Sequence, residues 1–170
     1  MVLTEILALD KWIEVEKQIT AKFSIDANVF DVKGIRVTDY KNWANPLCPE
    51  IKATDKGQSF ICAVAHMNIA AQAARSKKAL SQECDAGLMK LVVPIFVGDD
   101  FVGALCGCGV LPEGGEVESF LINKITGIDE SEIESLSKGI QTLSMERLAE
   151  IEAYLIKCVD KIVSDYEMRS

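Results

Sequence analysis

The chain has 170 residues, of which 49% are hydrophobic and 26% charged, and its formal net charge at pH 7 is −8. These values are typical of a globular protein with one domain of ordinary size. The negative charge argues against direct nucleic-acid binding, because phosphate contacts require clustered Lys and Arg side chains. No apolar run reaches the roughly 20 residues that a membrane span needs. The acidic N-terminus also lacks the pattern of a signal peptide, so we expect a cytoplasmic protein without membrane contact.

The first 60 residues predict one helix and one hairpin. Residues 3–23 place apolar side chains at helical spacing, which indicates an amphipathic helix. Two β-rich runs within residues 27–38, on either side of Lys33-Gly34, predict a hairpin. Residues 43–57 contain two of the four prolines, and we expect a loop with single turns there.

The middle of the chain predicts a helix followed by a buried hairpin. The alanine-rich segment 60–77 lacks Gly and Pro, which favours a helix. Two apolar runs, Leu91–Val97 and Phe101–Leu111, flank a short Gly/Asp break and predict the central hairpin of the sheet. Because side chains alternate along a strand, Cys106 and Cys108 should point to the same face.

The last third of the chain predicts three helices. The first two are expected over residues 117–126, ended by Gly127, and from Asp129 or Ser131 onwards. The last one follows Ser144 and runs to about Tyr166, with an apolar stripe at 3-4 spacing. Two interpretations of this stripe remain open: packing against its own domain, or a helix that forms a homodimer and passes a signal.

The order of these elements has no β-α-β alternation, which argues for an antiparallel sheet flanked by helices. The fold class predicted from the sequence is therefore α+β, with amphipathic helices at both ends. No linker divides the chain, so we expect one domain over residues 1–170, with its core at about 10–143 and the C-terminal helix at 144–168.

An ordered set of short motifs resembles the PocR-type sensory domain over roughly residues 10–160. The motifs are Asn45-Pro46-Leu47-Cys48-Pro49-x-Ile51, Cys62, Glu83-Cys84-Asp85-Ala86-Gly87, Val93-Pro94-Ile95, Gly103 and Cys108-Gly109. The resemblance implies a PAS/GAF-like fold with a cavity that senses small molecules such as diols. Members of this family usually precede output modules, so the resemblance implies a downstream signalling protein as partner.

Four cysteines coincide with these motif positions: Cys48, Cys62, Cys84 and Cys108. They come from separate predicted elements and can converge on a zinc ion or an iron–sulfur cluster, since both take thiolate ligands. Cys106 can replace Cys108 in such a set. The alternatives are that the thiols are inert and line a cavity or core, or that two of them form a redox-active pair.

Five further residues are candidates for contact with a ligand: Trp43, Asn45, His66, Asp85 and Cys106. Asn45 and Asp85 can form hydrogen bonds to a hydroxylated ligand in a mostly apolar pocket, or can bond their own backbone as turn residues. His66 lies one helical turn beyond Cys62 and can donate to a ligand, serve as an alternative metal ligand or simply pack as a satisfied polar residue.

The predicted function is a small-molecule or cofactor-binding sensory domain that is not an enzyme. The competing enzyme hypothesis would use Cys62 as nucleophile and His66 as base, and it needs the two side chains within hydrogen-bond reach. A cysteine-dependent redox protein or a metal carrier is the remaining alternative.

Overall fold

The computed structural model describes residues 1–170, and an antiparallel sheet forms its centre. The strand order is β2-β3-β4-β1, where the strands span Leu80–Glu83, Met89–Val97, Asp100–Pro112 and Asp26–Asp31. The predicted central hairpin is confirmed, because β3 and β4 pair along almost their full length. The short strand β5 (Thr142–Leu143), which the sequence pattern did not reveal, pairs in parallel with the end of β4.

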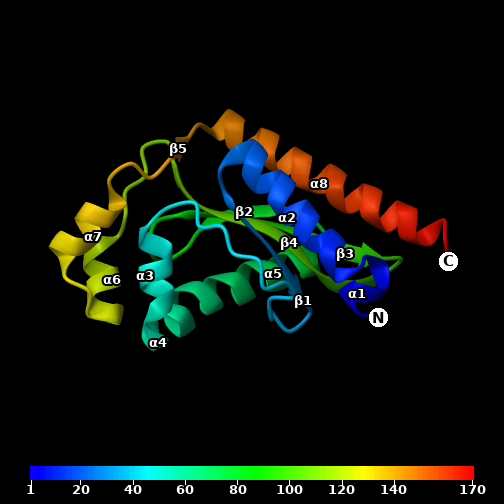
Figure 1. Cartoon of the computed structure of the whole chain (residues 1–170), viewed down its shortest axis with the longest axis horizontal. Coiled ribbons are helices and arrows are strands. Elements are labelled where there is room, and N and C mark those ends of the chain that lie inside the picture. The colour runs from blue at the N-terminus through cyan, green and yellow to red at the C-terminus, as the bar shows by residue number, and fades with distance from the viewer.

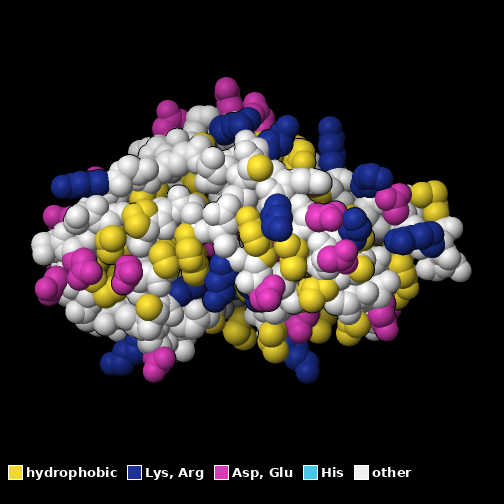
Figure 2. All heavy atoms as spheres, viewed as in Figure 1, with side chains coloured by type: hydrophobic (Ala, Val, Ile, Leu, Met, Phe, Trp, Pro, Cys, Tyr) yellow, Lys and Arg dark blue, Asp and Glu magenta, His cyan; other side chains and the backbone are white.

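Helices cover both faces of the sheet, as the α+β prediction required. One face carries α2 (Leu9–Phe23) and the long α8 (Met145–Glu167), and the other carries α5 (Val64–Ser76) (Figure 1). Both chain ends lie at the same end of the molecule (Figure 1). Acidic and basic side chains are spread over the view of Figure 2, with apolar groups between them.

The alternation of side chains along the strands divides the core between these two faces. Ala27, Leu91 and Leu105 belong to the large apolar cluster under α2 and α8, whereas Val92 and Cys106 pack with α5. The strand register supports the same division. Cys106 lies opposite Val92 of β3 and Asn28 of β1, and Cys108 lies opposite the residues two positions away on each strand, Lys90 and Asp26. The prediction that Cys106 and Cys108 share a face is therefore confirmed.

The predicted N-terminal helix is divided in the structure. A short α1 (Leu3–Ile6) precedes α2, and Leu7 between them has extended backbone. Trp12 explains how the two pieces are held together, because its buried indole Nε1 donates a hydrogen bond to the carbonyl of Leu3 at 3.0 Å. The amphipathic pattern was right, but it could not show this break.

The segment between the first strand and α5 is more helical than the sequence indicated. The predicted loop contains α3 (Leu47–Ala53) and the single turn α4 (Asp55–Gly57). The predicted helix 60–77 is present, but its first part, η1 (Gln58–Ala63), is a π-helix that continues into α5. The prolines stand at the start of α3, where the missing N–H groups have no intrahelical partner in any case.

The predicted hairpin at residues 27–38 is only half formed. Its first run is β1, which pairs mainly with β4, and its second run contributes one isolated bridge between Arg36 and Phe30. The turn at Lys33-Gly34 is present, and Gly34 has the positive φ of 75° that this turn requires.

The C-terminal helices follow the predicted order. The elements are α6 (Ser119–Thr126), ended by Gly127 in the left-handed conformation, and α7 (Glu130–Ser137). The Ser144 side chain caps α8 by accepting a hydrogen bond from the Arg147 amide at 3.1 Å. None of the helices combines the length and the apolar character that a membrane crossing requires.

The apolar stripe of α8 packs mostly against its own domain. Leu148, Ile151 and Leu155 are buried in the core under the sheet, and Val159 rather than Cys158 continues the buried row. The first half of the stripe is therefore occupied within the chain. Dimer formation through this helix stays a prediction.

Candidate functional site

A small cavity lies on the α5 side of the sheet, at the end where α3 and η1 cover the strands. It has a volume of about 40 Å³, and its wall is built from β1, α3, η1, the β2–β3 connection, β3 and β4. We call this cavity the chamber. Its chemistry comes from four thiols and four polar side chains: Cys48, Cys62, Cys84, Cys108, Asp26, Asn28, Lys52 and Lys90.

The four cysteines that the sequence singled out all line the chamber. Cys48 is in the first turn of α3, Cys62 is in η1, Cys84 follows β2, and Cys108 is on β4. All are free thiols, and burial raises the pKa of Cys108 to about 11 and the pKa of Cys48 further. The thiols of Cys48 and Cys108 are therefore protonated near neutral pH and are not activated nucleophiles.

Asn45 places Cys48 against the central strand. Its Oδ1 accepts hydrogen bonds from the amides of Leu47 and Cys48, both at 2.9 Å, and its Nδ2 donates to the carbonyl of Gly109 at 2.7 Å. A Cβ at Gly109 would lie 2.8 Å from the Cβ of Ala44, so only glycine lets this loop approach β4. Asn45 thus serves as a turn residue, and it does not line the chamber.

Lys90 is the most unusual group in the chamber wall. Its side chain comes from β3 opposite Cys108, and the residue is only 7% exposed. No protein group forms a hydrogen bond or an ion pair with its ammonium group. Burial favours the neutral amine, whereas negative charge on the sulfur atoms of Cys108 and its neighbours, present only when those thiols ionise, raises the pKa of Lys90. Lys90 is therefore a buried basic group that no hydrogen bond or ion pair of the protein engages.

Asp26 and Asn28 of β1 complete the polar side of the chamber. Asp26 Oδ2 accepts a long contact from the Cys108 thiol at 3.9 Å, whereas Asp26 Oδ1 and Asn28 Oδ1 are buried and have no hydrogen-bond partner. Burial raises the pKa of Asp26, and the cations Arg36, Lys52 and Lys90 act against that rise. Buried oxygens of native proteins are rarely left unpaired, so this wall has hydrogen-bonding capacity to offer.

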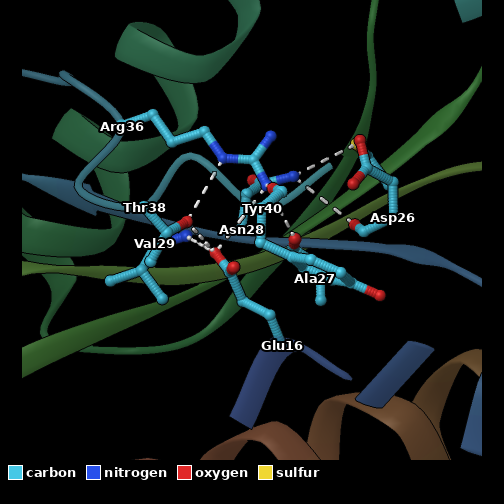
Figure 3. Close-up of polar contacts among 9 residues, drawn as sticks. Glu16, Asp26, Ala27, Asn28, Val29, Arg36, Thr38 and Tyr40 are labelled. Atoms are coloured by element: carbon cyan, nitrogen blue, oxygen red, sulfur yellow. Dashed lines mark hydrogen bonds and ion pairs between the residues drawn. The ribbon is translucent and has the colours of Figure 1, made fainter. Parts of the chain in front are cut away.

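A buried carboxylate network connects β1 to α2 behind this wall (Figure 3). Glu16 Oε1 accepts hydrogen bonds from Thr38 Oγ1 at 2.6 Å and from the Val29 amide at 3.0 Å, and it lies 3.8 Å from Arg36 Nη2. The same guanidinium donates to the carbonyls of Ala27 and Tyr40. The network therefore joins the strand that carries Asp26 and Asn28 to a helix on the opposite face of the sheet.

An open depression of about 530 Å³ adjoins the chamber on the outside. The two cavities share Phe30, Trp43 and Lys52, and the Lys52 ammonium lies 5.2 Å from the centre of the Trp43 ring. Arg36 and Lys41 also line the depression, and no acidic residue does. Of the five residues expected to contact a ligand, Trp43 alone lines the chamber.

The other expected contacts lie elsewhere. His66 Nδ1 is 4.0 Å from the Cys106 thiol, and both side chains are buried between α5 and the sheet. Burial lowers the pKa of His66 to about 3, which leaves it neutral. No hydrogen bond joins His66 to Cys62, so the pair required by the enzyme hypothesis is not formed. Asp85 lines a separate open depression beside α5.

Sequence reasoning missed the charged members of the site. Lys90 interrupts a strand that is otherwise apolar, and Glu16 lies on the buried stripe of α2 between Trp12 and Ile19. A charge at a position that must be buried was the available signal in both cases. Asp26, Asn28 and Lys52 gave no such signal, because their neighbours in the sequence do not fix their burial.

The side chains of the chamber are not arranged as a metal site in this structure. No group of three or more His, Cys, Asp or Glu side chains is placed to hold a metal ion. An antiparallel sheet with helices on both faces and a small chamber between them is an α+β arrangement consistent with the PAS/GAF-like fold.

Comparison with known families agrees with this class. The family model described as the sensory domain found in PocR matches residues 5–166, nearly the whole chain, and the chain belongs to that family. No curated protein and no solved structure matches it.

Proposed function

We propose that this chain receives a chemical signal in the chamber, as a small-molecule or cofactor-binding sensory domain of a signalling or regulatory system. The observation that carries the proposal is a pair of buried oxygens without hydrogen-bond partners, Asp26 Oδ1 and Asn28 Oδ1, in the same wall as the buried Lys90, which forms no ion pair. Each of these groups destabilises the folded chain while it has no partner. A ligand that forms hydrogen bonds or an ion pair with them would remove this cost and bind favourably.

The signal would leave the chamber through β1. This strand carries Asp26 and Asn28 at the chamber, and its Val29 amide binds Glu16 of α2. A ligand changes an output only if it binds two states of the protein unequally. We therefore propose that occupancy shifts α2 and the neighbouring α8, which would contact a second copy of the chain or a downstream signalling protein in the cytoplasm.

Ligand-dependent stabilisation tests this proposal. We expect a small ligand of the chamber to raise the midpoint of thermal unfolding in a concentration-dependent way, because it binds only the folded state. The panel contains short diols, short carboxylates and inorganic phosphate. The substitution Asn28→Ala should weaken the stabilisation, whereas Asn68→Ala on the exposed side of α5 should leave it unchanged. Equal stabilisation of both variants would place the ligand outside the chamber.

A thiolate-held cofactor is the second candidate, and the presence of Cys48, Cys62, Cys84 and Cys108 in one chamber wall favours it. Zinc and iron–sulfur clusters are the groups that four thiolates bind. Binding would displace the thiol protons and draw the four sulfur atoms into a coordination geometry.

Anaerobic purification, a visible absorption spectrum and analysis for iron, zinc and acid-labile sulfide test this candidate. Cys108→Ser should abolish a bound cofactor, whereas Cys158→Ser, a cysteine on α8 outside the chamber, should retain it. A colourless wild-type protein without metal after anaerobic purification would rule it out.

A further inference from the structure

The chamber wall holds a buried cation that forms no ion pair with any side chain of the protein. Lys90 is buried to 93% by the sheet and its covering helices, since only 7% of it is exposed, and it belongs to the chamber lining. Lys52 adds a second ammonium group to the same wall, while Asp26 is the single acidic residue there. On this basis we infer that the occupant of the chamber is a compact anionic group, with Lys90 as its principal charge partner.

The energetic reason is the cost of an isolated buried charge. Removing an ammonium group from water costs several kcal/mol even in real proteins, unless a group of opposite charge compensates. The one carboxyl group of the chamber wall, that of Asp26, does not form an ion pair with Lys90. An anion in the chamber would supply the missing partner.

The approach to the chamber has the matching charge. The outer depression contains Arg36, Lys41 and Lys52 and no acidic side chain, although the chain as a whole has a net charge of −8. A local positive field of this kind concentrates anions at the entrance and disfavours cations. Charge therefore favours the same class of occupant at the entrance and inside.

The volume limits the size of that occupant. A single water molecule needs roughly 10–15 Å³ of such space, and the chamber offers about 40 Å³. In its present shape it admits a group of a few heavy atoms, such as formate or acetate.

Two sources can supply this negative charge, and the inference rests on the proposed function in either case. One is a free small anion, a carboxylate or phosphate. The other is a metal centre: when four thiols bind one divalent ion they release four protons to solvent, and the tetrathiolate complex has a net charge of −2. Lys52 and Lys90 together balance that charge.

The substitution Lys90→Met tests the inference in the full chain, since it removes the charge and keeps an unbranched side chain of similar length. Without an occupant, the variant should unfold at the same or a higher temperature than the wild type, because an unpaired buried charge has been replaced by an apolar group. Lys157→Met, at an exposed position of α8, is the matched control.

Calorimetric titration with sodium formate, sodium acetate, sodium phosphate and neutral propane-1,2-diol forms the first arm. We expect one of the anions to bind, the diol not to bind, and Lys90→Met to weaken anion binding by about ten- to a hundredfold, the worth of a charged hydrogen bond. Anaerobic reconstitution with ferrous iron and sulfide, or with zinc, forms the second arm. Metal retention that falls in Lys90→Met and not in Lys157→Met would identify the metal centre as the source.

Three outcomes would overturn the inference. Binding of the neutral diol with equal affinity to the wild type and Lys90→Met would leave the sensory proposal standing but remove the anion. A clear loss of stability of the unoccupied Lys90→Met variant would show that the lysine is a structural element. If no probe in either arm bound, both the inference and the proposed function would fail.

Discussion

Glu16 is the residue whose ionisation should dominate the pH dependence of stability. Its carboxylate is fully buried on the inner face of α2, where Thr38 and the Val29 amide both donate hydrogen bonds to one oxygen. The other oxygen, Oε2, has no partner. The substitution Glu16→Gln keeps an oxygen that can accept both hydrogen bonds and removes the ionisable group.

The direction and size of the effect follow from the pKa of Glu16. Burial raises it from 4.5 to about 7, against the opposing effects of Thr38 and Arg36. Between these two values the folded chain retains a proton that the unfolded chain has released, so stability is highest below pH 4.5 and is lost as the pH rises through about 7. At about 1.36 kcal/mol for each pH unit, the full loss is about 3 kcal/mol.

Urea unfolding of the wild type and Glu16→Gln at pH 5, 6, 7 and 8 measures this loss. The wild type should lose about 2.5 kcal/mol relative to the variant between pH 5 and 8, since a part of the full loss falls below pH 5, so that the variant is comparatively more stable at pH 8. Glu14→Gln is the control, because Glu14 lies on the same helix, exposed and paired with Lys11. If the wild-type and Glu16→Gln profiles ran parallel, folding would not raise the pKa of Glu16 and the reasoning would be refuted.

Three further substitutions address the packing around the chamber and α8. Gly109→Ala should lower the free energy of unfolding by about 2 kcal/mol or more, because the φ of 93° disfavours alanine and the new Cβ would lie 2.8 Å from that of Ala44. Chemical denaturation measures this loss, and an unchanged stability would contradict the close approach of the two segments. Asn45→Ala should cost about 2–3 kcal/mol and increase the reactivity of the chamber thiols toward a maleimide; unchanged reactivity would show that Asn45 does not position Cys48. Ser144→Ala should cost about 1 kcal/mol through loss of the α8 cap, and a thermal midpoint equal to that of the wild type would argue against that cap.

The sequence pattern predicted the elements wherever a single periodicity governs a long segment. The central hairpin has two uninterrupted apolar runs around a Gly/Asp turn, so both its position and its antiparallel pairing could be predicted. The break between α1 and α2 could not, because Trp12 stabilises it through a hydrogen bond to a backbone carbonyl. For the same reason α3 was predicted as a loop: the helix is stabilised by Asn45 and by contact with β4, and its own propensity is modest.

In the candidate site, too, the sequence predicted some residues correctly and the tertiary structure decided the others. The family resemblance singled out Cys48, Cys62, Cys84 and Cys108 as residues that can converge, and all four line the chamber. His66 and Asp85 were proposed from proximity in the sequence to those cysteines, yet the structure directs them to other surfaces. A position next to a site residue in the sequence does not fix where the side chain points, because the turn and strand geometry decide it.

The sequence by itself determined the α+β class, the family, the order of the main helices and strands, and the set of thiols. Only the tertiary structure decided which charges join those thiols, because the burial of Lys90, Asp26 and Glu16 depends on elements far away in the chain. A local pattern specifies which side of an element is apolar. The identity of the groups that meet across a cavity is set by long-range register and packing, which no short window of sequence contains.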